Sequence, residues 1–137
     1  MKATYANLVN SRFFNPAFNS AIFDGPVRIY FAQFHESLAL KVYFGLQQKY
    51  GDLLHDIKTR HRAYGQSCLI MLYPSQDSFA MAFEGVHDLV IEDQLGEDKI
   101  LGVNGPFDDD RLSEILSFIA MALGSLQKSS SEVALVP

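Results

Sequence analysis

One segment of the 137-residue chain constrains the fold more than any other. Residues 36–60 carry apolar side chains at spacings of three and four, which places these side chains on one face of a helix. The apolar side chains on this face are Ala39, Val42, Tyr43, Leu46, Tyr50, Leu53, Leu54 and Ile57. Gly51 weakens a helix, so a break into two shorter helices at that residue stays an alternative. A helix with one apolar face buries that face against a sheet or another helix.

The segments around this helix predict strands. Residues 21–23 and 27–34 are joined by Asp24-Gly25-Pro26, and Asp-Gly supplies the positive φ that hairpin turns need. Residues 67–73 are almost continuously apolar, which is typical of a central strand. Three more strands are predicted at residues 79–83, 89–91 and 99–103, the last two forming a hairpin around the acidic loop 92–98.

Helices are predicted at both ends of the chain. Residues 3–14 form a short one that ends at Asn15-Pro16, and Asp108 caps one that runs to about Gln127. The element order α-ββ-α-ββ(β)-α indicates an α+β domain, with a mostly antiparallel sheet, a long central helix and an apolar C-terminal helix. We expect one globular domain over residues 1–128 and a flexible tail over residues 129–137.

This element order resembles that of profilin-like folds, the roadblock and longin type. The resemblance is one of element order, with no sequence motif behind it, so it implies a fold and no function. A hot-dog fold also wraps a sheet round one long helix, but it accounts poorly for a closing helix as apolar as residues 112–126.

Composition and charge exclude several classes of protein. The formal net charge of -5 argues against a nucleic-acid binder, because phosphate binding needs a basic surface. The most apolar stretch, residues 115–126, falls short of the roughly 20 residues that a membrane span needs. Cys68 is the single cysteine and the N-terminus has no signal-peptide pattern, so we expect a cytoplasmic protein.

No catalytic, cofactor or metal residue is predicted. His55 and His61 are six residues apart, whereas two metal ligands on one helix face need a spacing of three or four. Cys68 lies in an apolar strand, where a thiol is unreactive. We expect His35 to begin a helix rather than act as a general base. Residues 102–106 precede a helix but lack the lysine of a phosphate-binding loop.

The most informative feature is surplus apolar surface near the two ends of the chain. The helix over residues 112–126 is apolar round most of its circumference, beyond the stripe that one sheet contact needs. Either residues 3–14 cover its back or a second subunit does. Exposed apolar surface marks an interaction site, and the commonest arrangement is a two-fold homodimer. The candidate interface is Phe13, Phe14, Phe18, Phe118, Met121 and Ala122.

Acidic residues gather late in the chain. Residues 84–110 hold nine acidic side chains and one basic one, Lys99. A solvated loop explains this run, and the alternative is a surface that steers a basic partner. The candidate acidic surface is Glu92, Asp93, Glu97 and Asp98.

These observations predict a non-enzymatic regulatory or adaptor domain that acts through protein–protein interaction, as a homodimer. The alternative is a small-molecule sensor or small enzyme with a pocket between sheet and helix. Four polar side chains would line that pocket: Tyr30, His35, Tyr73 and His87. A third hypothesis is nucleic-acid binding through the basic residues 58–62.

Overall fold

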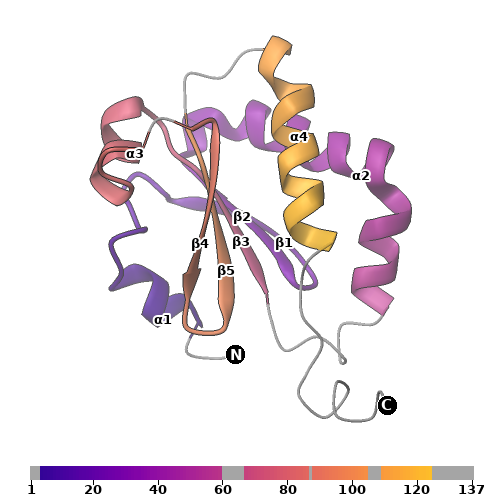
Figure 1. Ribbon diagram of the computed structural model, residues 1–137, viewed down its shortest axis with the longest axis horizontal. Coiled ribbons are helices and arrows are strands. Elements are labelled where there is room, and N and C mark those ends of the chain that lie inside the picture. The colour runs from indigo at the N-terminus through magenta and orange to yellow at the C-terminus, as the bar shows by residue number, and fades with distance from the viewer. Residues whose placement is uncertain (1–3, 60–66, 87, 105–108, 125–137) are drawn as a thin grey trace.

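The computed structural model describes residues 4–59, 67–86, 88–104 and 109–124 (Figure 1). Its elements are α1 (Thr4–Val9), β1 (Ser20–Asp24), β2 (Val27–Phe31), the short 3-10 helix η1 (Gln33–His35), α2 (Glu36–Thr59), β3 (Cys68–Leu72), α3 (Gln76–Ala82), β4 (Val90–Leu95), β5 (Asp98–Val103) and α4 (Asp109–Gly124). The predicted α+β class is confirmed, with the long helix and the closing helix in their expected places.

The five strands form one sheet in the order β1-β2-β3-β5-β4. Its two outer pairs, β1–β2 and β4–β5, are antiparallel, with five and six aligned residue pairs. The inner pairs, β2–β3 and β3–β5, run parallel, with four and five. A parallel connection needs a crossover, and α2 supplies it between β2 and β3. All five residues of β3 are buried, as the apolar run predicted for a central strand.

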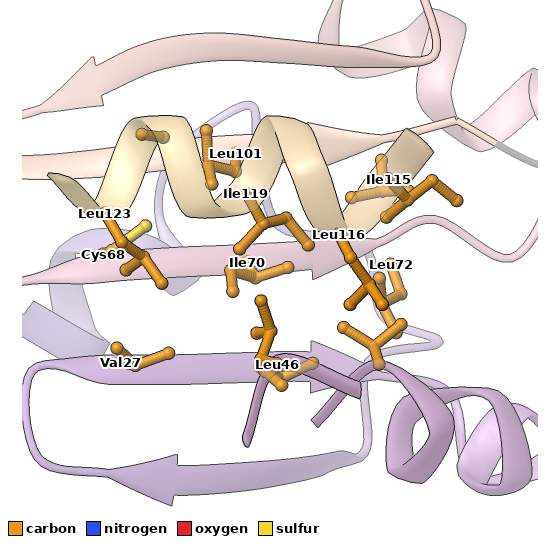
Figure 2. Close-up of a cluster of buried hydrophobic side chains, with 14 of the residues drawn as sticks. Val27, Leu46, Cys68, Ile70, Leu72, Leu101, Ile115, Leu116, Ile119 and Leu123 are labelled. Atoms are coloured by element: carbon orange, nitrogen blue, oxygen red, sulfur yellow. The ribbon is translucent and has the colours of Figure 1, made fainter. Parts of the chain in front are cut away.

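Helices cover both faces of this sheet (Figure 1). Successive strand residues point to opposite faces, so β3 divides its side chains between two cores. Cys68, Ile70 and Leu72 join the core under α2 and α4, which Figure 2 shows. Leu69 and Met71 join the second core, which contains residues of α1 and α3. The two clusters place α1 and α4 on opposite faces, so residues 4–9 do not cover the outer side of α4.

The predicted strand at residues 79–83 is wrong, because this segment belongs to helix α3 and its C-cap. The Ser75 side chain accepts a hydrogen bond from the Ser78 N–H, and the Ser78 hydroxyl accepts one from the Ser75 N–H. This reciprocal pair satisfies amides that a helix leaves unpaired in its first turn. Phe79 is buried and Met81 is 78% exposed. The apolar positions 79, 82 and 83 thus follow the helical spacing, and the alternation suggested by Met81 was misleading.

Other differences concern where elements end. Helix α1 ends at Val9 rather than near residue 14, and β2 ends at Phe31, followed by η1. The break expected near Gly51 is a kink at Tyr50, whose φ of -128° and ψ of 32° leave the helical region. Strands β4 and β5 extend through most of the acidic loop and turn at Gly96, where φ is 60°. The Asp108 cap and the tail at residues 129–137 lie outside the described residues.

Gly102 in β5 is the tightest point of the second core. A Cβ at this position would lie 2.8 Å from Cζ of Phe83 and closer still to Cε2 of the same ring. We expect Gly102→Ala to lower the free energy of unfolding by about 1–3 kcal/mol, because a buried ring has to shift. Chemical denaturation measures this. Gly51→Ala is the matched control, since nothing lies within 4 Å of its Cβ, and stability there should stay unchanged or rise.

Candidate functional site

A reactive centre would bring several titratable or metal-binding side chains together. Within residues 4–59, 67–86, 88–104 and 109–124, no group of three or more His, Cys, Asp or Glu side chains is placed to hold a metal ion. His55 is exposed, and His61 lies outside the described residues. No helix in the described part of the chain is both long enough and apolar enough to cross a bilayer.

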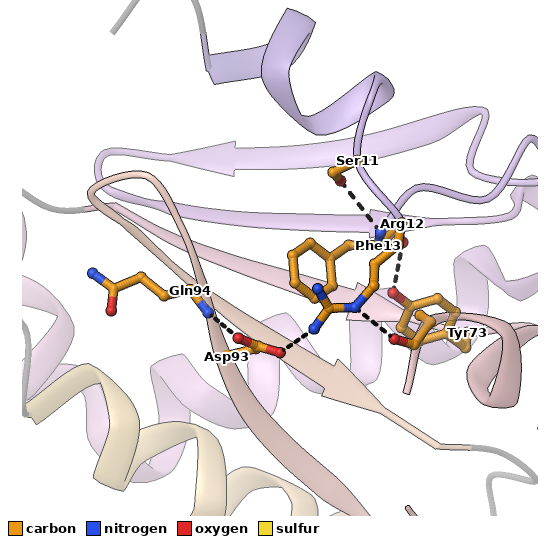
Figure 3. A network of polar contacts seen from close by, with 7 residues as sticks. Ser11, Arg12, Phe13, Tyr73, Asp93 and Gln94 are labelled. Carbon is orange, nitrogen blue, oxygen red and sulfur yellow. Dashed lines mark hydrogen bonds and ion pairs between the residues drawn. The ribbon is translucent and has the colours of Figure 1, made fainter. Parts of the chain in front are cut away.

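Three side chains have pKa values shifted chiefly by burial. Burial raises the pKa of the Cys68 thiol from 9.0 to about 12, and it raises the pKa of the Tyr73 hydroxyl. Burial lowers the pKa of His35, so its imidazole is neutral at physiological pH. The Tyr73 hydroxyl donates a hydrogen bond of 2.6 Å to the Phe13 carbonyl (Figure 3). This contact anchors the N-terminal segment to the residue that follows β3, which is a structural role.

The predicted small-molecule pocket was assigned to Tyr30, His35, Tyr73 and His87. Tyr30 is buried in β2, and His35 lies after that strand in η1. Tyr73 is buried in the second core, and His87 lies outside the described residues. The structure has a pocket near β1 and β2, and Tyr30 is the one described member of this set that lines it.

The candidate interface is divided by the fold. Phe13, Phe18 and Ala122 are buried within the single chain, and Phe14 is half-buried. These buried side chains offer no surface to a partner. Phe118 and Met121 lie on the outer side of α4 and are 42% and 69% exposed.

The candidate acidic surface is largely engaged inside the chain. Asp93 forms a 2.6 Å ion pair with Arg12, which Figure 3 shows, and Glu92 forms one of 2.8 Å with Lys99. Asp98 accepts a 3.1 Å hydrogen bond from the Ser67 N–H, and Glu97 is exposed at the hairpin turn. Three of these four carboxylates therefore hold segments of the chain together. Of the basic residues 58–62, Lys58 pairs with Asp24 at 3.3 Å, and residues 60–62 lie outside the described part.

A pocket of about 540 Å³ lies against the β1–β2 hairpin. It opens on the sheet face that carries Tyr30, on the side of the second core. Phe23 is paired with Arg28 across the hairpin and Ala21 with Tyr30, so all four side chains point to this face. Its lining is Phe18, Asn19, Ser20, Ala21, Phe23, Gly25, Arg28 and Tyr30. We call this the hairpin pocket.

Among the described residues that line the hairpin pocket, Arg28 is the single charged one. Its guanidinium carbon lies 5.4 Å from the centroid of the Phe23 ring, in the range of a cation–π contact. The Phe23 and Tyr30 rings meet edge to face at 6.0 Å. Among the described residues, no carboxylate forms an ion pair with Arg28. The hairpin pocket thus combines aromatic walls with one cation.

The nearest carboxylate along the hairpin is engaged elsewhere. Asp24 accepts a 2.7 Å hydrogen bond from the Tyr43 hydroxyl, and the Lys58 ammonium lies 3.3 Å from the same oxygen. Both partners come from α2, which packs on the other face of the sheet. The Asp24 carboxylate raises the pKa of Tyr43, mainly through this hydrogen bond. These contacts fix the hairpin to α2, so within the described residues Asp24 does not neutralise the charge of Arg28.

The hairpin pocket lies beside an edge of the sheet. Strand β1 is the end strand and pairs with β2 on one side (Figure 1). In an antiparallel pair, alternate backbone N–H and C=O groups point away from the neighbouring strand. Proteins protect such edges with lysine or proline, and Ser20–Asp24 contains neither. Within the described residues, no second strand pairs with this edge.

The sequence predicts the β1–β2 hairpin but not the hairpin pocket beside it. The alternation in residues 27–34 showed that Arg28 and Tyr30 share one face. The missing step was to place Phe23 opposite Arg28, which the two-residue turn after Asp24 implies. The role of Phe18 depends on the path of residues 10–19, and no pattern in the sequence indicates that path.

Comparisons with known proteins identify no relative. No protein-family model matches this chain, and no curated protein and no solved structure matches it significantly. The resemblance to profilin-like folds therefore rests on element order alone.

Proposed function

We propose that this chain is a non-enzymatic interaction domain with a regulatory or adaptor role. In this proposal it binds an extended polypeptide segment along β1 and takes one apolar side chain of that segment into the hairpin pocket. The observation that carries the proposal is the position of an aromatic pocket directly beside an open sheet edge. Strand addition of this kind takes affinity from main-chain hydrogen bonds and specificity from side-chain pockets.

The chemistry of the site fits this ligand better than it fits a substrate. An open edge needs N–H and C=O partners at strand spacing, which an extended peptide provides. The volume of about 540 Å³ lies within the range of ligand sites, and the walls are three aromatic rings. In the part of the lining that the structure describes there is no His, Cys, Asp or Glu. The single cysteine of the chain supports a cytoplasmic location as part of the same proposal.

A selection from a random dodecapeptide library, displayed on phage and probed with the full chain, tests this proposal. We expect enrichment of segments rich in β-branched and aromatic residues. The corresponding synthetic peptides should slow hydrogen exchange at residues 20–24. Methylating alternate peptide nitrogens on the paired edge should abolish binding, because those nitrogens lose their hydrogen-bond donors.

Two surface variants make the binding measurement specific. Phe23 is 65% exposed, so Phe23→Ser should leave the fold intact and weaken the selected peptides by about fivefold or more. Met81→Ser is the matched control, because Met81 is an apolar residue on α3 that is also mostly exposed, at 78%. Binding that survives Phe23→Ser, or protection that maps to another element, would contradict the proposal.

A homodimer is the second candidate, and the exposed side chains Phe118 and Met121 favour it. Both lie on the outer side of α4, which no described element covers. Light scattering tests this candidate. A mass of one chain at micromolar concentration would refute it, and a dimer that Met121→Ser converts to monomer would support it.

A further inference from the structure

We propose that the segment bound at β1 carries an acidic side chain, which pairs with the guanidinium of Arg28. This inference rests on the proposed function and names the class of partner: an extended peptide with an apolar residue beside an aspartate or glutamate. The observation that supports this inference is the charge of the hairpin pocket, since Arg28 is the single charged residue in the described part of its lining.

The guanidinium of Arg28 keeps its positive charge available to a ligand. Its described contact is with the ring of Phe23, which orients the guanidinium without neutralising it. Asp24 lies in the same hairpin but is held by Tyr43 and Lys58 on the α2 side. A carboxylate brought by a ligand therefore meets no internal competitor among the described residues.

Aromatic side chains surround the charge of Arg28. Arg28 is half-buried, its guanidinium lies over the Phe23 ring, and it lines the hairpin pocket together with Tyr30. When a peptide covers these rings, water leaves and the local dielectric falls, so an ion pair strengthens and an unpaired cation becomes unfavourable. Guanidinium and carboxylate also match as a two-pronged hydrogen-bonded pair. A ligand with a neutral or basic residue at this point would leave Arg28 without a partner.

The charge of the whole protein also acts on an acidic ligand. The net charge of -5 repels an acidic peptide at long range. This repulsion is screened beyond about 8 Å at physiological ionic strength, whereas the contact with Arg28 is shorter and partly shielded from solvent. Local attraction therefore dominates at physiological salt. We expect one acidic residue at a fixed position in the peptide rather than an acidic run.

The experiment repeats the peptide selection with wild-type protein and with Arg28→Glu. Wild type should enrich peptides with an aspartate or glutamate close to the apolar residue, and Arg28→Glu should enrich lysine or arginine there. By fluorescence anisotropy, changing the acidic residue of a wild-type-selected peptide to its amide should weaken binding about tenfold. Arg28→Lys should keep the acidic preference, and Arg28→Gln should remove it.

Arg111→Glu is the matched control. Arg111 is an exposed arginine on α4, so this variant changes the net charge by the same amount as Arg28→Glu. It should leave the acidic preference unchanged, which separates the local contact from long-range repulsion. Circular dichroism melting checks that each variant is folded.

The outcomes separate this inference from the proposed function. If peptides are enriched and protect residues 20–24 but show no acidic preference, the pairing with Arg28 is refuted and strand addition stands. If Arg111→Glu shifts the preference as much as Arg28→Glu does, the pairing is also refuted. If nothing is enriched, strand addition fails and the inference fails with it.

Discussion

Phe83→Ala is expected to lower the free energy of unfolding by about 3–5 kcal/mol, as for other buried phenylalanines. The ring of Phe83 lies 5.5 Å from that of Phe13, 5.9 Å from Tyr73 and 5.1 Å from Phe79. Its edge also packs on the backbone of Gly102. Removing the ring opens a cavity where α3, β5 and the N-terminal segment meet, so all three lose contacts. Urea denaturation measures the effect.

Two further variants serve as controls for the predicted effect of Phe83→Ala on stability. Met81→Ala changes a side chain only two residues away, but one that is 78% exposed, so stability should change by less than about 0.5 kcal/mol. Gly102→Ala should become nearly harmless in the Phe83→Ala background, because the ring that it displaces is gone. Additive effects of Gly102→Ala and Phe83→Ala would show that the two residues do not touch.

Alkaline pH is expected to destabilise the protein through Cys68. Burial holds the pKa of this thiol at about 12 in the folded chain, against an ordinary value of 9.0. Between these values the unfolded chain has lost the proton and the folded chain retains it, so stability falls as pH rises. Lys99 opposes the shift, and Glu92 and Asp98 reinforce it. From pH 8 to 10.5, this single group should lower the free energy of unfolding by about 2 kcal/mol.

Cys68→Ala isolates this effect from other groups that titrate at high pH, Tyr73 among them. The stability of the variant relative to wild type should rise with pH over the same window, since alanine has no proton to lose. A constant difference between the two proteins up to pH 10.5 would mean that the thiol is not desolvated. As a second measurement, Ellman's reagent should label folded wild type only as fast as the protein unfolds.

The elements predicted best were those with a strong local pattern. Helix α2 has eight apolar positions on one face, and the apolar run of β3 marks it as central. Helix α3 was missed because seven residues hold too few turns for a clear period. The Met81 side chain also imitated strand alternation. The local signal for helix α3 is the pair of serines at positions 75 and 78, whose hydroxyls cap its first turn.

The pairing of strands that are far apart in the sequence cannot be predicted from local sequence patterns. The parallel alignment of β2 with β3 joins Ile29 to Ile70, across the whole of α2. No turn specifies that register, so the sequence indicated strands without their order. For the same reason, local patterns cannot distinguish Phe13 from Phe118 within the candidate interface. Both are apolar, and only the tertiary path shows that one is buried under α3 and the other faces outward.

The anchoring of the N-terminal segment has a consequence for biosynthesis. Arg12 contacts the Ala82 carbonyl and the Asp93 carboxylate, 70 and 81 residues further along the chain. At roughly 5–20 residues per second, the ribosome makes Asp93 about 4–16 s after Arg12. For most of that interval Phe13 and Phe18 lack their ring partners Phe83 and Tyr73, which are not yet synthesised. We therefore expect chaperones to bind a nascent chain of this protein at its early aromatic residues more than at its later helices.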